Sequence, residues 1–268
     1  MDEVRKFTVI GNPIGHSLSP TIHKEFARQQ GINIQYKMIE PESEDHFETH
    51  TQSFFSKKGY GANVTIPFKE LAFNFANEHD ISALECECAN TLMAHNGKIK
   101  AFNTDGEGFL KDLENKDINL IQKKILILGA GGSARSIINS LSKIHIEKID
   151  ILSRTERRID QIIDKHKTSS NISHYKKGSK YNMVINTTPV SLNNNEISFP
   201  TDIFDSSSIS YDLFYSKNIT SFQTWSKNNG AKETHNGLGM LIEQAALSYN
   251  IWNNFKPETK GLNKILGF

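Results

Sequence analysis

The segment Lys123–Ile137, KKILILGAGGSARSI, constrains the fold of this chain more than any other. Its apolar run Ile125–Leu128 ends at a glycine and predicts a strand buried on both faces. The next residues, Gly129-Ala130-Gly131-Gly132-Ser133-Ala134, fit the pattern G-x-G-x-x-A, and apolar residues then recur at helical spacing over 136–146. A strand, a glycine-rich turn and a helix in this order are typical of dinucleotide binding, because the turn and the helix N-terminus offer N–H groups to a pyrophosphate. Flavin- and methyl-donor-binding sheets use similar turns, and the alternative to a dinucleotide site is a tight turn that binds no ligand.

The residues after the expected strand 148–152, the next one after the glycine turn, indicate which dinucleotide is bound. An NAD site usually places an acidic residue ~20 positions beyond the glycines, where it binds the ribose hydroxyls. This chain has Ser153-Arg154-Thr155-Glu156-Arg157-Arg158 there. A guanidinium pairs with a 2′-phosphate, which a carboxylate would repel. The alternative is a solvated basic start of a helix, but at this distance from a glycine turn the sequence favours NADP.

The remaining chain alternates strand-like and helix-like segments, which predicts an α/β fold. Ser19-Pro20 opens a helix, with serine as the expected N-cap, and Gly31 closes it. Asn96-Gly97 lies between two strand-like runs and predicts a hairpin. Residues 167–180 are polar and lysine-rich and are expected to form a surface excursion. The expected strands are 7–10, 35–39, 62–66, 91–94, 98–102, 124–128, 148–152, 183–186 and 209–213, and the expected helices include 43–58, one from Pro67, 134–145, 156–166 and 239–255.

Polar groups gather at three expected strand ends in the first half of the chain. The segment 11–20, GNPIGHSLSP, places the hydroxyls of Ser17 and Ser19 at a helix start, where they suit a carboxylate. The segment 61–69, GANVTIPFK, places Lys69 on the first turn of a helix close to Thr65. Asp105 follows another strand. Each residue alone could be a cap or a surface charge, but together they predict a polar cleft.

Composition excludes several classes of function. The 31 basic and 30 acidic residues nearly cancel, which argues against a nucleic-acid or anionic-membrane partner. No apolar run approaches the roughly 18 residues of a membrane span, and the start MDEVRKF lacks the core of a signal peptide. Cys86 and Cys88 form neither a disulfide framework nor a zinc pattern, so we expect a cytoplasmic protein. His46 and His50 have helical spacing but lack a third ligand, so we expect an exposed helix face and no metal site.

These segments together resemble shikimate dehydrogenase across nearly the whole chain. The matching motifs are GNPIGHSLSP, GANVTIPFK, ANT (Ala89–Thr91), NTDGEG, GAGGSAR, SRTERR, YDLFY and GLGMLIEQAA. The resemblance implies NADPH-dependent reduction of 3-dehydroshikimate to shikimate, on the chorismate route to aromatic amino acids. It also implies two α/β domains across a cleft. Residues 1–102 plus 239–268 would bind substrate, and residues 103–238 would form a Rossmann-type NADP domain.

The resemblance also implies roles for individual residues. Lys69 and Asp105 would be the catalytic pair, and Asp105 would also contact substrate. The other expected substrate contacts are Ser17 and Ser19 for the carboxylate, and Thr65, Asn90, Tyr215 and Gln244 for the ring hydroxyls. The expected cofactor contacts are Gly129, Ala130, Gly131, Gly132, Ser133, Ser153, Arg154, Thr155, Arg158, Leu213, Gly237 and Met240, with Gly237 at the nicotinamide amide and Met240 against its ring.

The chain departs from the family pattern at a few positions. Glu87-Cys88 replaces the usual Gly-Ala before Asn90, Leu213 replaces a frequent methionine, and Ser191 replaces the glycine of an Asn-Ala-Thr-x-x-Gly-Met loop. Two other functions stay open: a quinate dehydrogenase with relaxed cofactor use, and a non-catalytic nucleotide-sensing module. The presence of Lys69 and Asp105 argues against the second. The sequence leaves the oligomeric state open, with a homodimer among the options.

Overall fold

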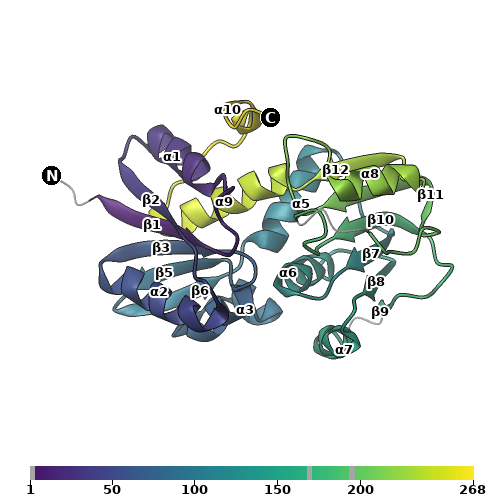
Figure 1. The fold of residues 1–268 in the computed structure, drawn as a ribbon, viewed down its shortest axis with the longest axis horizontal. Helices are drawn as coiled ribbons and strands as arrows, with labels where there is room; N and C mark the ends of the chain where they lie inside the picture. Colours follow the sequence, from purple (N-terminus) through teal and green to yellow (C-terminus); the bar gives the residue numbers. More distant parts are fainter. Residues whose placement is uncertain (1–3, 168–170, 193–196) are drawn as a thin grey trace. The chain divides into compact units, whose positions relative to one another are not determined.

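A computed structural model describes residues 4–167, 171–192 and 197–268 (Figure 1). The chain divides into two compact units, Met1–Gly108 with Ile242–Phe268, and Phe109–Leu241. The division falls inside two helices, α5 (Asp105–Asn115) and α9 (Leu238–Asn253), whereas the sequence suggested boundaries after residues 102 and 238. Each helix begins at or shortly after an expected boundary and is divided between the two units. Each unit contains one six-stranded sheet.

The sheet of the first unit has the strand order β2-β1-β3-β5-β6-β4. Strands β1, β2 and β3 are mutually parallel, and β5 pairs antiparallel with both β3 and β6. The hairpin predicted at Asn96-Gly97 joins β5 to β6, and both residues have positive φ angles, of 51° and 75°. The elements of this unit, besides parts of α5 and α9, are β1 (Arg5–Ile10), α1 (Ser19–Gln30), β2 (Ile34–Ile39), α2 (Glu44–Ser56), β3 (Gly59–Val64), α3 (Lys69–Phe75), β4 (Glu78–His79), α4 (Ile81–Cys86), β5 (Thr91–His95), β6 (Lys98–Phe102) and α10 (Leu262–Ile265).

Two apolar clusters show which helices cover each face of this sheet. Because side chains alternate along a strand, Ile10 of β1 points to the opposite face from Phe7 and Val9. Ile10 belongs to the cluster that contains residues of α2 and α3, including Phe47. Phe7 and Val9 belong to the cluster that contains Trp252 of α9. Helices α2 and α3 therefore cover one face, and α9 covers the other.

The sheet of the second unit is wholly parallel, with the order β12-β11-β10-β7-β8-β9. Numbered from β7 and read from the β9 edge, this is the order 3-2-1-4-5-6 of a Rossmann-type dinucleotide-binding fold. The elements are β7 (Lys124–Leu128), α6 (Gly132–Leu141), β8 (Lys148–Leu152), α7 (Glu156–Lys165), β9 (Ile172–His174), β10 (Tyr181–Asn186), β11 (Phe204–Asp212), α8 (Ser221–Asn228) and β12 (Glu233–Asn236).

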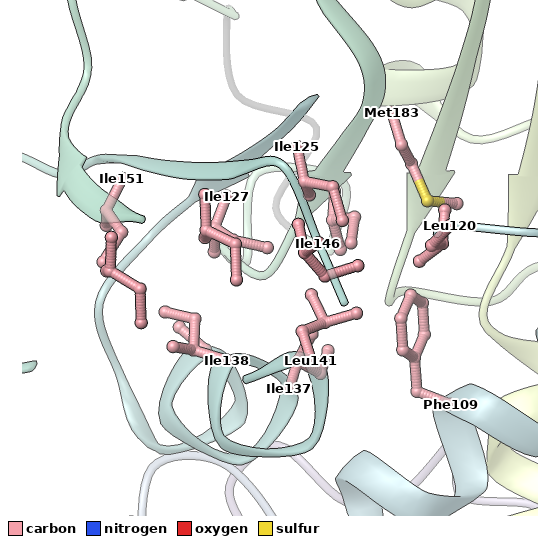
Figure 2. Close-up of a cluster of buried hydrophobic side chains, with 14 of the residues drawn as sticks. Phe109, Leu120, Ile125, Ile127, Ile137, Ile138, Leu141, Ile146, Ile151 and Met183 are labelled. Atoms are coloured by element: carbon pink, nitrogen blue, oxygen red, sulfur yellow. The ribbon is translucent and has the colours of Figure 1, made fainter. Parts of the chain in front are cut away.

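The predicted strand at 124–128 is buried on both faces, as expected. Ile125 and Ile127 pack with residues of α5, α6 and α7, including Ile137 and Phe109 (Figure 2). Leu126 and Leu128 point to the other face and join a cluster that includes Phe222 of α8. Helices on both faces keep water from the parallel strands, which is the arrangement that such sheets require.

Several local predictions need correction. Ser19 is not the N-cap of α1: Leu18 holds that position, and Ser19 is the first helical residue. The helix expected over 134–145 spans Gly132–Leu141 and is followed by turns. The expected surface excursion 167–180 contains the edge strand β9, while residues 168–170 lie outside the described part of the chain. The sequence also gave no expectation for α4, α5, α8 or β12.

Candidate active site

A lysine and a carboxylate meet at the ends of two strands in the first unit. Lys69 is the first residue of α3, and Asp105 is the first residue of α5, a few positions after β6. The Lys69 Nζ donates a hydrogen bond to Asp105 Oδ2 at 2.5 Å. The side chains are only 13% and 5% exposed, so solvent screens this ion pair weakly. Of the first-half residues predicted to gather, these two are brought together.

The Asn90 side chain connects this ion pair to helix α9. Its Nδ2 donates to Asp105 Oδ1 and to Thr104 Oγ1, both at 2.8 Å, and to Gln244 Oε1 at 3.0 Å. Its Oδ1 accepts from the Thr104 N–H at 2.9 Å. Gly108 of α5 allows α9 to approach closely at Gln244, because a Cβ on residue 108 would lie 2.7 Å from both the backbone nitrogen and the Cβ of Gln244. The expected substrate residues Asn90 and Gln244 therefore lie in one network with Asp105.

A second layer of polar side chains lies beneath Asn90. The Asn63 Nδ2 donates to Ser248 Oγ at 3.1 Å and to the Asn90 carbonyl at 3.3 Å. Its Oδ1 accepts from the Tyr36 hydroxyl at 2.7 Å. Burial raises the pKa of Tyr36 well above its ordinary value, so the phenol stays protonated and donates. Sequence reasoning missed Tyr36, Asn63, Thr104 and Ser248, although Asn63 and Thr104 lie inside the quoted motifs and Ser248 follows Gln244 by one helical turn.

The predicted hydroxyl pair lies at the start of α1. Ser17 Oγ accepts a hydrogen bond from the Ser19 N–H at 3.3 Å, so Ser17 supplies the acceptor at this helix start. Ser19 itself is buried. Thr65 follows β3, and its methyl group packs against Gly11, where a Cβ would lie 2.3 Å from Thr65 Cγ2. Tyr215, the other expected substrate contact, belongs to the second unit, where its ring stacks on that of Phe214.

The strand, turn and helix predicted around the glycine motif are present in the second unit. Gly129 directly follows β7 and has a φ of 112°, a conformation that favours glycine, and a Cβ there would meet Thr187 Oγ1 at 2.4 Å. Gly131 is the N-cap of α6, and nothing lies within 4 Å of its Cβ direction. Ala130 is buried, whereas Gly132 and Ser133 are partly exposed at the first turn of α6. The turn therefore leaves open space beside the helix N-terminus, where a phosphate can approach the backbone.

The basic segment lies at the start of α7, directly after β8. Thr155 is the N-cap of α7, and its N–H donates to Ser153 Oγ at 3.4 Å. Arg154 and Arg158 are both exposed. In a parallel sheet the ends of β7 and β8 lie at the same edge, so the arginine segment and the glycine turn follow neighbouring strands.

The remaining expected cofactor residues lie near the ends of β11 and β12. Gly237 is close to Leu213, whose carbonyl oxygen would be 2.1 Å from a Cβ at residue 237. Met240 is buried in the same apolar cluster as Ile125, and Leu213 packs against that cluster. Burial raises the pKa of Asp212, the last residue of β11, although four hydrogen bonds to its carboxylate oppose the change.

No metal site is found in the described part of the chain, where no three His, Cys, Asp or Glu side chains are suitably grouped. On α2, His46 is exposed and His50 is half-buried, and each lies within 4 Å of Glu42, at 3.4 and 3.7 Å. Within the described ranges no helix is long and apolar enough to cross a membrane.

Comparisons with known proteins identify the family. The matching family models are the shikimate dehydrogenase substrate binding domain over residues 9–92, shikimate/quinate 5-dehydrogenase over 112–193, and the shikimate 5′-dehydrogenase C-terminal domain over 237–265. The chain is 38% identical to the NADP(+) shikimate dehydrogenase of Shewanella halifaxensis, over 95% of this chain and 92% of that protein. It is also 38% identical to that of Vibrio campbellii, over 96% and 94%.

Solved structures agree over nearly the full chain. Shikimate dehydrogenase from Aquifex aeolicus has a TM-score of 0.86 and 28% identity, over 99% of this chain and 98% of that one. The Thermus thermophilus enzyme, solved with NADP(H) and shikimate, has a TM-score of 0.86 and 26% identity, over 97% and 98%. The parallel sheet and its glycine turn define a dinucleotide-binding protein of the Rossmann type. The chain belongs to the shikimate dehydrogenase family.

Proposed function

We propose that this protein is an NADPH-dependent shikimate dehydrogenase that reversibly reduces 3-dehydroshikimate to shikimate. The observation that carries the proposal is the 2.5 Å contact between Lys69 and Asp105, joined through Asn90 to Gln244. The first unit would bind substrate and the second NADP. The two buried cysteines, Cys86 and Cys88, form no disulfide in the structure, which is consistent with a reducing cytoplasm.

The residues around the glycine turn fit a bound NADP. Open space at Gly131 would admit the pyrophosphate to the N–H groups of α6. The exposed guanidinium groups of Arg154 and Arg158 would pair with the 2′-phosphate. When bound, NADPH supplies the hydride for the reduction of the ketone.

The chemistry of the first unit follows from the ion pair. Reduction of a ketone builds negative charge on its oxygen, and a lysine ammonium beside that oxygen stabilises the charge and donates a proton. Asp105 holds the Lys69 ammonium in position, and Asn90 in turn holds Asp105 through its Oδ1. Weak solvent screening strengthens each of these interactions. Ser17 and Ser19 would hold the substrate carboxylate, and Thr65, Asn90, Gln244 and Tyr215 its hydroxyls.

The test is to follow nicotinamide absorbance with the purified protein. Shikimate with NADP should give strong reduction of the cofactor, and shikimate with NAD should give much less. Quinate serves as the competing substrate, because one matching family model describes shikimate and quinate dehydrogenases together. Reduction with quinate and NAD at a higher kcat/KM would favour the quinate alternative. Binding of NADP with no turnover of either acid would favour the nucleotide-sensing module.

A further inference from the structure

Ser191 stands where the family pattern has glycine, and its hydroxyl makes three hydrogen bonds in the structure. The residue is 4% exposed, in the loop that follows β10. Its hydroxyl donates to Asp212 Oδ2 at 2.6 Å and accepts from the Phe222 N–H at 3.2 Å and from Ser221 Oγ at 3.3 Å. A glycine could make none of these three contacts.

Asp212 places Ser191 in a larger hydrogen-bond network. This carboxylate also accepts from Thr220 Oγ1 at 2.7 Å and from Asn186 Nδ2 at 2.9 Å. It is fully buried at the end of β11. The Ser191–Asp212 pair therefore joins the loop after β10 to the end of β11 and to the start of α8.

The other end of the same loop packs on the glycine turn. Thr187 Oγ1 donates to the Leu128 carbonyl at 2.8 Å, and the Thr187 N–H donates to the same oxygen at 2.9 Å. A Cβ on Gly129 would lie 2.4 Å from Thr187 Oγ1 and 3.2 Å from Thr188 Cγ2. The conformation of residues 187–192 therefore determines which side chains lie against the glycine turn on the β10 side.

Strand order determines which half of a dinucleotide this loop would meet. In the sequence β10-β7-β8, the glycine turn follows the central strand. Arg154 follows β8 on one side of it, and the 187–192 loop follows β10 on the other. A cofactor with its 2′-phosphate at Arg154 and its pyrophosphate on the turn extends its nicotinamide half toward the loop.

We propose that Ser191 is a positioning residue which, by bonding Asp212, holds residues 187–192 in the conformation that receives the nicotinamide half of the cofactor. The inference rests on the NADP site proposed above. Without the hydroxyl the loop populates other conformations, and the apparent Kd rises in proportion to the lost fraction of the competent one. A fall of that fraction to about one tenth weakens NADP about tenfold.

The experiment compares Ser191→Ala with a matched control, Ser208→Ala. Ser208 is equally buried in the same unit, and its hydroxyl donates to the Tyr181 carbonyl at 2.6 Å, at the β10 end far along the strand from the loop. Binding of NADP and of adenosine 2′,5′-bisphosphate, which lacks the nicotinamide half, is measured by calorimetry. Hydrogen exchange at the Thr188 and Leu192 amides reports on the loop itself.

Ser191→Ala should weaken NADP about tenfold, leave the bisphosphate within twofold and speed exchange at both amides. Ser208→Ala should lower Tm without changing either affinity. If Ser191→Ala is poorly folded, Ser191→Gly carries the family residue and should show the same split. Unchanged NADP affinity, or equal weakening of both ligands, would overturn the inference while leaving the proposed function intact. A wild-type protein that binds the bisphosphate and NADP equally weakly would overturn both.

Discussion

The buried histidine of α1 should make the first unit sensitive to acid. His23 is fully buried, and neither ring nitrogen has a hydrogen-bond partner among the described residues. Its ring stacks on that of Tyr36 with the ring centroids 4.6 Å apart, and its centroid lies 5.3 Å from that of the Trp252 ring. Burial lowers the pKa of His23 to about 3, a change that the nearby Asn63 side chain only partly offsets. Folding therefore keeps this ring neutral where the unfolded chain binds a proton.

The sign and size of the effect follow from proton linkage. Between the folded pKa of about 3 and the unfolded value of 6.5, the unfolded state binds more protons, so stability falls as pH falls. At pH 5 the solution is about 1.5 units below the unfolded pKa, which corresponds to a loss of about 2 kcal/mol relative to pH 7.5. A folded pKa one unit higher leaves this figure almost unchanged, because the folded ring is still neutral at pH 5.

The assay is urea unfolding at pH 7.5 and pH 5 in a Trp225→Phe background. Trp252 then is the only tryptophan and reports on the unit that contains His23. His23→Phe should lose about 2 kcal/mol less than the parent between the two pH values. His95→Gln, at an exposed position of the hairpin, should behave as the parent does. Burial also lowers the pKa of His235, but that residue is present in all three proteins. Equal pH dependence of parent and His23→Phe would refute the reasoning.

Two further substitutions test the cofactor site and the close approach of two helices. Arg154→Asp should raise the KM for NADP at least tenfold, because it replaces a charge-assisted pair with repulsion, while the KM for NAD changes little; Arg157→Asp is the control, and equal loss with both cofactors would contradict the assignment. Gly108→Ala should destabilise the first unit by about 1–3 kcal/mol, because its Cβ would lie 2.7 Å from the Gln244 backbone. Gly15→Ala, which has nothing within 4 Å, should be nearly neutral in the same denaturation assay, and equal effects of the two substitutions would argue against the contact.

The local parts of the fold could be predicted from the sequence because their causes are local. The run Ile125–Leu128, the glycine turn and the helix that follows depend mainly on neighbouring residues, and all three are present, although α6 begins at Gly132 and not at residue 134. The predicted N-cap of α1 was wrong because the helix begins one residue earlier: the Leu18 carbonyl accepts the first helical hydrogen bond, from the Ile22 N–H, so Ser19 already lies inside the first turn. The short strand β9 was missed because its three residues gain their strand character only by pairing with β8.

The polar network could be predicted only in part, because it depends on pairing between distant segments. Asn63 meets Thr91 through the antiparallel register of β3 and β5, and no local pattern specifies that register. Ser248 reaches the same network from α9, far along the chain. Lys69 and Asp105 were predicted from their places near strand ends, the resemblance paired them, and the two side chains lie in contact. Their catalytic role, like the other substrate and cofactor contacts, stays a prediction.

The role of Lys69 as proton donor is the central claim, and the kinetics of Lys69→Ala test it most directly. Loss of one electrostatic stabiliser of the transition state should lower kcat at least a hundredfold, about 3 kcal/mol, with a much smaller change in the KM for shikimate. Lys98→Ala removes another lysine–carboxylate contact of the first unit, the exposed 2.9 Å pair with Glu78, and should leave kcat unchanged. Circular dichroism establishes that both variants are folded. Near-normal kcat in a folded Lys69→Ala protein would contradict the account.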